Sequence, residues 1–409
     1  MKKISLLLIL VTSVLSAGGY KIPEVSLNAV ALSAANVAHN KSSDAAYYNP
    51  ANMVFMKDEA SLEFTLSYIG LSEIDYKGSH QYSAGLGGAF VPNVDTHSQK
   101  EDFLIPSFFY VSPKIDGVRF GFAMVVPAGL SKRWEDQPAE SASEEFTLET
   151  VELNPSVAFP MNDDLALALG FRAIYSKGIV KAQLPGVMSQ DMDGDSVDFG
   201  FNVALSYKAT DDLELAVTYR SKIDLEVEGD ADLFYSPGGT IDPVRNVDVS
   251  VEVPVAAQLN VALAYTFPTK TTFEFVYERT YWSSYSSLNF NYEDPTAEAV
   301  FGTSKPKDWD DTNSFRFGIT QELDKLTLMA GCVIDETPVP EETLAYELPD
   351  SDSVSVSFGG RYQVNEKLST GMAALYSMRE DRKVTNDTLN GEFTDSSVLI
   401  VSVGLEYKF

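Results

Sequence analysis

Hydrophobic and polar residues alternate strictly along the last part of the chain, from Ser397 to Phe409. A period of two predicts a β-strand, because successive side chains of a strand point to opposite faces. One face would carry Leu399, Val401, Val403, Leu405, Tyr407 and Phe409, and the other Val398, Ile400, Ser402, Gly404, Glu406 and Lys408. An apolar face opposite a polar one is typical of a barrel wall between lipid and a wet or plugged lumen. An edge strand of an ordinary sandwich is the alternative.

The same alternation recurs along the whole chain, for example from Leu165, Leu213, Ser314 and Val354 onward. We predict fourteen strands, beginning near residues 59, 103, 117, 148, 164, 197, 212, 254, 271, 311, 325, 352, 367 and 397. Short turns are expected at 113–117, 160–164, 208–212, 267–271, 322–325 and 364–367, and long loops near 71–102, 127–147, 176–196, 223–253, 282–310, 335–351 and 379–396. Short turns on one rim and long loops on the other predict an all-β fold, a transmembrane antiparallel β-barrel of the outer-membrane type.

The first seventeen residues have the pattern of a secretory signal peptide, with Lys2 and Lys3, an apolar run and a small-residue site ending at Ala17. Cleavage there would change the formal net charge from −29 to −31. Such an acidic chain is not expected to bind nucleic acid. A lone cysteine, Cys332, excludes an intramolecular disulfide framework. No later stretch is apolar for long enough to form a transmembrane helix.

A barrel of about fourteen strands encloses a lumen too wide for wall side chains alone to fill. Residues 18–58 precede the first predicted strand and are not strand-like, and 26–40 resembles a short helix with a small-residue face. We therefore predict three parts: a signal peptide at 1–17, a hatch inside the lumen at 18–58, and the barrel at 59–409.

The segment SSDAAYYNPANM, residues 42–53, resembles the N-terminal hatch signature of the FadL/TodX family of outer-membrane transporters. The resemblance continues in order along almost the whole chain. It includes VPAGLSKRW (126–134), LNPSVAF (153–159), VDFGFNVALSY (197–207), LAVTYRSKID (215–224), VPVAAQLNVALAY (253–265), YWSSYSSL (281–288), DETPVPEE (335–342) and LPDSD (348–352). The family resemblance implies passive transport of long-chain fatty acids or other hydrophobic compounds, with hatch rearrangement and lateral exit into the membrane.

The resemblance makes Asp44, Asn49, Pro50 and Ala51 the expected hatch and gate residues. Pro50 fixes its own φ and disfavours helix at Asn49, so a defined turn is expected there. Gly121 is expected in the strand that carries the lateral opening, since a glycine within a strand often marks a bulge or kink. An ordinary turn and an inert packing glycine are the alternatives.

Candidate ligand contacts fall into two groups. By alternation, Arg172, Arg220, Arg316 and Arg361 would face the lumen, where a guanidinium could hold a carboxylate or pair with luminal Glu214, Glu274, Glu278 or Glu406. Apolar residues in the long loops, which are Ile179, Val180, Leu184, Val187, Leu233 and Phe234, would line an outer groove or pack loop on loop.

The expected ligand is a fatty acid, an alkane or an aromatic compound, and no cofactor or metal site is predicted. The other expected partners are outer-membrane lipid, lipopolysaccharide and the barrel assembly machinery, which would read the terminal strand ending in Phe409. A monomer in the outer membrane of a Gram-negative bacterium is expected. A general diffusion porin or structural barrel is the alternative function. An outer-membrane hydrolase is a weaker one, because His39, His80 and His97 form no recognisable catalytic arrangement.

Overall fold

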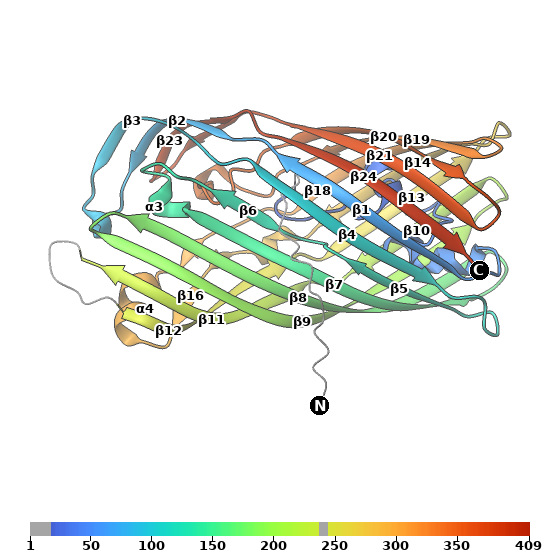
Figure 1. The fold of residues 1–409 in the computed structure, drawn as a ribbon, viewed down its shortest axis with the longest axis horizontal. Coiled ribbons are helices and arrows are strands. Elements are labelled where there is room, and N and C mark those ends of the chain that lie inside the picture. The colour runs from blue at the N-terminus through green and yellow to red at the C-terminus, as the bar shows by residue number, and fades with distance from the viewer. Residues whose placement is uncertain (1–17, 237–243) are drawn as a thin grey trace.

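Fourteen antiparallel strands close into a barrel in the computed structural model, which describes residues 18–236 and 244–409 (Figure 1). They are β1 (Ser61–Leu71), β4 (Glu101–Val111), β5 (Arg119–Val125), β7 (Glu145–Pro160), β8 (Leu165–Leu184), β9 (Met188–Lys208), β10 (Leu213–Arg220), β13 (Gln258–Thr266), β14 (Thr271–Thr280), β18 (Thr312–Glu322), β19 (Leu326–Asp335), β20 (Ser353–Gln363), β21 (Leu368–Arg379) and β24 (Ser397–Lys408). The first and last strands pair along their length, from Ser61 opposite Lys408 to Leu71 opposite Val398. The predicted fourteen-stranded barrel is confirmed. The predicted signal peptide, residues 1–17, lies outside the described residues.

The two faces of each strand meet different surroundings. In β24, Leu399 and Leu405 are exposed on the outside, whereas Ile400 and Glu406 are buried on the inside. In β8, Phe171 is 51% exposed and its neighbour Arg172 only 2%. Exposed aromatic and aliphatic side chains on one face, with buried polar groups on the other, are what a lipid-facing wall around a filled lumen requires.

Two of the predicted long loops are instead continuations of the wall. β8 and β9 pair without a break from Leu165 opposite Tyr207 to Leu184 opposite Met188, so residues 176–196 form the end of one long hairpin. Gly186 at its tip has φ +75°, which a residue without Cβ adopts readily. The predicted loop at 223–253 contains β11 (Ile223–Tyr235) and β12 (Val244–Val255), and residues 237–243 lie outside the described residues.

Apart from the helices inside the barrel, the other short strands and helices lie at the extracellular end, on the left of Figure 1. A four-stranded sheet combines β2 (Asp75–Gln81), β3 (Phe90–His97), β22 (Arg382–Thr385) and β23 (Leu389–Thr394). Short elements complete this end: η2 (Ala84–Leu86), β6 (Leu130–Arg133), α3 (Glu140–Ser143), η3 (Trp282–Ser284), β15 (Ser287–Leu288), β16 (Phe290–Tyr292), α4 (Pro295–Phe301), β17 (Lys305–Pro306) and η4 (Glu341–Thr343).

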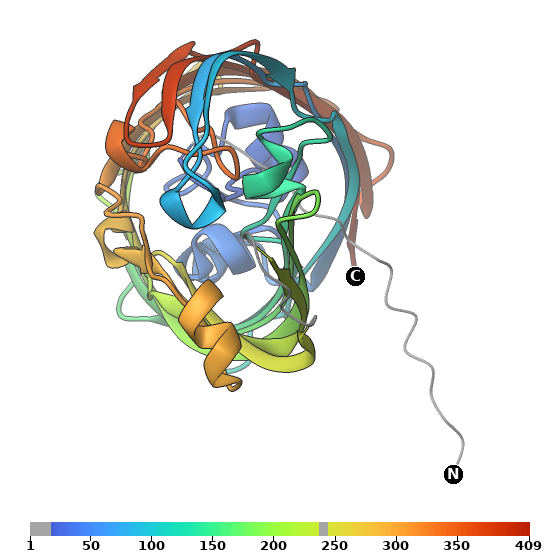
Figure 2. The ribbon, with the colours of Figure 1, turned by 90° about the vertical axis from the view of Figure 1, so that its left-hand side faces the viewer.

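Residues 18–56 fold inside the ring of strands, where Figure 2 shows them in blue. The hatch, as we name residues 18–56, contains α1 (Leu27–Leu32), α2 (Ala45–Tyr48) and η1 (Pro50–Phe55), and residues 57–60 connect it to β1. α1 lies against wall positions without side chains. A Cβ built on Gly331 would come within 2.2 Å of the backbone of Leu32, so only glycine fits there. Among the described residues, no helix is long and apolar enough to cross a membrane.

Candidate functional site

The turn at Asn49 and Pro50 fixes the lower half of the hatch to the wall. Pro50 begins η1, and the Asn49 side chain accepts a hydrogen bond from the backbone N–H of Ala51 (3.2 Å). Its amide group donates to Val37 O (2.7 Å) and to Ser206 Oγ on β9 (2.8 Å). Asn49 therefore caps one hatch segment while binding a second segment and the barrel.

Small side chains, mostly alanines, form the wall surface against which this turn packs. Ala51 is fully buried and packs in a cluster of small side chains from the hatch and the wall. The wall contributes Val111, Ala158, Ala166, Ala168 and Ala204 to this cluster. Small side chains let the hatch backbone approach the strands closely, so this contact depends on a snug fit.

Asp44 connects the two halves of the hatch. Its carboxylate accepts hydrogen bonds from Ser26 Oγ (2.6 Å) and Asn36 Nδ2 (3.0 Å), and it is fully buried. Burial raises the pKa of Asp44, and the Arg361 guanidinium opposes that rise. Because Ser26 also caps α1, Asp44 links the start of that helix to the segment before α2.

Three wall carboxylates hold the middle of the hatch. Glu274 on β14 accepts the backbone N–H groups of Val37 (2.6 Å), Ala38 (2.6 Å) and His39 (3.2 Å). Glu214 on β10 pairs with the His39 ring. Glu406 on β24 accepts from the backbone N–H and hydroxyl of Ser43, each at 3.1 Å.

Ion pairs hold the beginning of the hatch. Lys21 pairs with Glu278, and Glu24 accepts from Arg316 at 3.3 Å. The charged groups around Glu24 are Arg316 on β18, Asp335 on β19, Lys21 on the hatch and Glu278 on β14. Burial raises the pKa of Glu24 to about 7, and Arg316 opposes the rise.

All four candidate arginines lie buried in the lumen beside carboxylates. Arg172 and Arg220 both pair with Glu152. The Arg172 contact is bidentate, from Nε to Oε1 (3.1 Å) and from Nη2 to Oε2 (3.0 Å). Arg316 contacts Glu278 at 3.4 Å as well as Glu24. Arg361 donates from Nη2 to Glu63 (2.6 Å) and from Nε to Asn28 of the hatch (2.6 Å). Arg220 lies over the Tyr47 ring of the hatch, 4.1 Å from its centroid, so three of the four guanidiniums contact the hatch directly.

The third wall strand is broken at residues 126–129, between β5 and β6. β5 pairs with β4 only between Phe108 and Val111, so 101–107 of β4 have no described strand partner on this side. The hatch occupies the break: Ile22 N–H donates to Pro127 O (2.9 Å). Gly121 lies below the break, within the regular part of β5, where a Cβ would come 2.8 Å from Met53 Sδ of η1.

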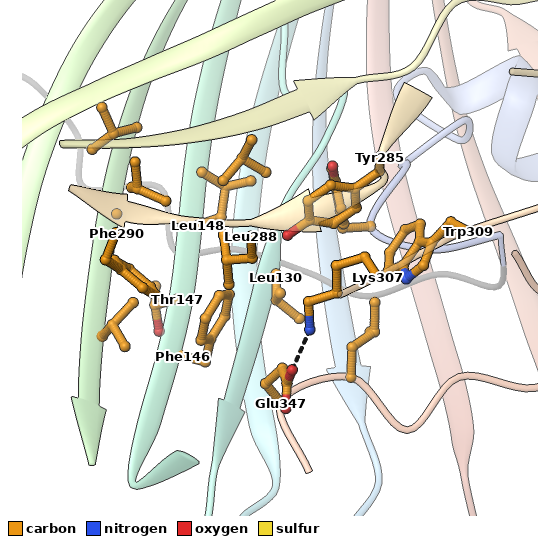
Figure 3. Close-up of a pocket in the computed structure, with 17 residues that line it drawn as sticks. Leu130, Phe146, Thr147, Leu148, Tyr285, Leu288, Phe290, Lys307, Trp309 and Glu347 are labelled. Atoms are coloured by element: carbon orange, nitrogen blue, oxygen red, sulfur yellow. Dashed lines mark hydrogen bonds and ion pairs between the residues drawn. The ribbon is translucent and has the colours of Figure 1, made fainter. Parts of the chain in front are cut away.

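An apolar pocket lies above the first hatch residues (Figure 3). It contains about 560 Å³ of free space, including the part open to solvent. The aliphatic and aromatic lining comprises Tyr20, Leu130, Phe146, Leu148, Val180, Val227, Val251, Val253, Tyr285, Leu288, Phe290, Trp309 and Leu348. The lining is mostly aliphatic and aromatic, as is typical of sites for small apolar molecules.

The pocket contains one ion pair, formed by Lys307 and Glu347, which Figure 3 shows at its edge. Burial raises the pKa of Glu347, but the Lys307 ammonium outweighs that effect and holds the pKa below its ordinary range. The charges therefore compensate each other, and the rest of the lining offers mainly apolar contact. Tyr20 forms the floor, packing edge-on against Trp282 with ring centroids 4.8 Å apart.

The six residues expected in an outer groove lie on two faces of the extracellular hairpins. Alternation along β8 directs Val180 toward the pocket and Ile179 to the opposite face, and Leu184 lies near the hairpin tip. Leu233 is buried, whereas Phe234 on the opposite face of β11 is half-buried. Val187 lies in the turn that joins β8 to β9. Only Val180 of the six lines the described pocket.

Sequence reasoning missed most of the contacts that hold the hatch. Lys21, Glu24 and Glu152 were not singled out, although the buried ion pairs depend on them. Charged residues on otherwise lumen-facing strand positions are the one signal that could have found Glu152. Lys21 and Glu24 lie in irregular chain with no such signal.

Comparison with known proteins places this fold among outer-membrane transporters. A family model described as "Outer membrane protein transport protein (OMPP1/FadL/TodX)" matches residues 8–409. The long-chain fatty acid transport protein of Escherichia coli O6:H1 is 24% identical over 333 residues, covering 69% of this chain and 71% of that protein.

Two solved structures share the fold. The crystal structure of a Pseudomonas aeruginosa FadL homologue matches with a TM-score of 0.83 at 21% identity, covering 95% of this chain and 99% of that one. The Pseudomonas putida toluene transporter TodX matches with a TM-score of 0.72 at 18% identity, covering 97% and 100%.

Proposed function

The chain belongs to the family of outer-membrane transport proteins that includes OMPP1, FadL and TodX, and from this membership we propose that it takes up long-chain fatty acids or chemically similar hydrophobic molecules. It is a transporter of the Gram-negative outer membrane and not an enzyme. The observation that carries the proposal is the apolar pocket whose floor is Tyr20 of the hatch.

The pocket suits a molecule with a long apolar body. Burying apolar surface stabilises a bound ligand by about 25 cal/mol per Å², and the lining is dominated by Val, Leu, Phe and Trp side chains. The printed names of the relatives include a long-chain fatty acid transport protein and a toluene transporter. Both kinds of compound are therefore reasonable test ligands.

Release would follow displacement of the hatch from the broken third strand. Tyr20 and Ile22 bond to residues 127–129 of the break, so the pocket floor and the plug in the wall are the same stretch of chain. A ligand that displaced Tyr20 would also free this break. It could then leave sideways between β4 and β6 into the membrane, down its own concentration gradient and without an energy source.

Pro50 would set the geometry of the gate. It starts η1 with its φ already restricted, and Asn49 beside it binds Ser206 on the wall. Replacing proline lets the turn adopt other conformations. The two hydrogen bonds that the Asn49 side chain donates, to Val37 O and Ser206 Oγ, are then weakened. Hatch-gated transport should therefore be sensitive to this residue.

The test is uptake of a labelled long-chain fatty acid by cells that lack their own transporter, comparing wild type with Pro50→Ala. Pro92→Ala, at an exposed position of β3, is the matched control. A heat-modifiable gel shift confirms that each barrel is folded. We expect uptake by wild type and the control, and a clear loss in Pro50→Ala. Absence of uptake by folded wild type, with fatty acid, alkane and toluene alike, would refute the proposed function.

A further inference from the structure

The wall is interrupted a second time, where β9 passes from β10 to β11. β9 pairs with β10 up to Arg220 and with β11 only from Glu228 onward. The described stretches between these points, 196–201 on β9 and 221–227 on the other chain segment, share no strand register. They also differ by one residue in length, so the register shifts across the interruption.

One backbone hydrogen bond and two hydrogen bonds to side chains close this interruption in place of a continuous ladder. Ser221 bonds to Phe201 through both its backbone N–H (2.9 Å) and its hydroxyl (3.0 Å). Farther along, the Glu226 N–H donates to the Asp198 carboxylate at 3.2 Å. In a sheet that N–H would meet a carbonyl of a strand about 4.8 Å away. A side chain that reaches across the interruption indicates that the two backbones lie farther apart.

Gly200 and Ile223 fill the inner side of the interruption. A Cβ built on Gly200 would lie 2.6 Å from Ile223 Cγ1, so the isoleucine side chain rests directly on the glycine backbone. Ile223 is 2% exposed. The Ser221 hydroxyl lies equally close, at 2.6 Å from the same Cβ position, so Ile223 and Ser221 together cover the inner side. A rotamer change can move the Ile223 side chain without breaking a hydrogen bond.

The apolar pocket reaches both interruptions of the wall. Leu130 lines it just above the break at 126–129, and Val227 lines it at the end of the second interruption. An adjoining cavity shares Val227 and is bordered by Gly178, Gly194 and Gly229. These glycines are directly opposite one another on β8, β9 and β11, so three adjoining positions of the wall carry no side chain.

The outer side of the second interruption faces apolar surroundings. Val197 is 56% exposed and Phe199 is 61% exposed, as lipid-facing side chains are. The next outward positions along β9 and β11 are Asp195, Asp193 and Glu228, all exposed. The interruption therefore lies where the lipid-facing belt meets the charged extracellular surface.

The strands on the far side of the interruption are able to move as one body. β10 and β11 pair with β13 and β12 in a single continuous register, including Arg220 opposite Gln258 and Ile223 opposite Val255. The hairpin can thus bend at residues 221–222 and 256–257 without losing pairing between its own two arms. Widening the whole interruption would cost the Asp198 contact and the two Ser221–Phe201 hydrogen bonds, but no ladder bond within the hairpin.

Resting on the proposed uptake of hydrophobic molecules, we propose that the interruption between 196–201 and 221–227 is a second lateral opening of the pocket. A molecule with an alkyl or aromatic body passes through it between the outer leaflet and the pocket. The route requires Ile223 to swing off Gly200 and the Asp198 to Glu226 hydrogen bond to open. The strands β7, β8 and β9 separate this opening from the break at 126–129, so the pocket has two lateral openings.

A disulfide can lock this opening reversibly. The Cβ position at residue 200 lies at most about 4.1 Å from that of residue 223, from the 2.6 Å contact and one C–C bond, which suits a disulfide. The test uses Gly200→Cys with Ile223→Cys, in a Cys332→Ser background that removes the single native cysteine. The matched control is Ser67→Cys with Ser402→Cys, whose hydroxyl groups are 2.6 Å apart across the fully paired β1–β24 seam.

Uptake of fatty acid, alkane and toluene probes is measured for each folded protein, oxidised and then reduced with dithiothreitol. We expect the oxidised 200–223 pair to lose uptake and recover it on reduction, while the control pair is indifferent to oxidation. Unchanged uptake by the oxidised 200–223 pair, with active parent protein, overturns the second opening and leaves the proposed function standing. An inactive parent protein refutes both.

Discussion

Glu274 is the wall residue whose loss should loosen the hatch most selectively. Its two carboxylate oxygens accept three consecutive backbone N–H groups, from Val37 and Ala38 at 2.6 Å and from His39 at 3.2 Å. Glu274→Gln preserves the size of the side chain but replaces one acceptor oxygen with an N–H donor. The amide can still accept from Val37 and Ala38, but it directs donors at the His39 N–H.

The magnitude follows from the hydrogen bonds that change. A hydrogen bond to a charged group contributes about 1.5–3 kcal/mol, and one between neutral groups about 0.5–1.5 kcal/mol. Losing one charge-assisted bond and weakening two others should destabilise the docked segment by about 1–3 kcal/mol. That corresponds to about a 5- to 150-fold increase in the population of the undocked segment, since about 1.4 kcal/mol is a factor of ten.

Amide hydrogen exchange followed by mass spectrometry measures this population directly. In Glu274→Gln, the amides of residues 37–39 should exchange faster by the same factor, because exchange requires the segment to open. Glu214→Gln is the matched control, because Glu214 contacts the His39 ring and not these three backbone groups. Exchange at 37–39 as slow as in wild type would refute the view that the Glu274 carboxylate holds this segment.

Three further predictions concern the gate and the pocket. Because burial raises the pKa of Glu24 to about 7, the docked hatch holds this proton more tightly than a solvated hatch would. Docking of the hatch is then strongest below about pH 4.5 and weakens as the pH rises through about 7. Leak conductance in planar bilayers should therefore rise between about pH 4.5 and 7. Glu24→Gln, which cannot ionise, should abolish this rise. Val251→Trp should fill the pocket and reduce uptake, whereas Ser250→Trp on the opposite face of β12 should not; equal uptake by both would remove the pocket from the route. Gly121→Leu should push against both Ser156 of β7 and Met53 of η1, which lie 2.5 and 2.8 Å from the Cβ position, and destabilise the protein by about 1–3 kcal/mol. This would lower the temperature of the gel-shift transition; an unchanged transition would mean that neither contact is tight.

Alternation of side chains was sufficient to predict every strand of the barrel, because a wall between lipid and lumen requires it. The same rule does not say which face is inside. In β11, apolar Ile223 and Leu225 are buried on the inner face, and acidic Glu226 and Glu228 are exposed on the outer one, the reverse of the lipid-facing strands. Periodicity is identical in both cases, so residues 223–253 could not be distinguished from a loop by looking for apolar outer faces.

The hatch contacts could not be predicted from the sequence for a different reason. Glu24 meets Arg316 across 292 positions of chain, and Asn49 meets Ser206 across 157. Such pairs depend on how an irregular segment folds within a closed ring of strands. Local sequence patterns do not indicate which wall residue such a segment will meet. The predicted strand count did indicate that something must fill the lumen, since the width of the ring follows from the number of strands.

The connection between hatch and barrel is only residues 57–60, which enter β1 directly. When the hatch leaves the wall, its end next to β1 therefore stays within about 14 Å of its docked position, and its return is an intramolecular event. Short tethers of this kind give an effective concentration of about millimolar or more. Individually weak contacts such as those of Asn49 are thus enough to dock the hatch again after each passage. The short lifetime of the undocked state then limits permeability to other solutes.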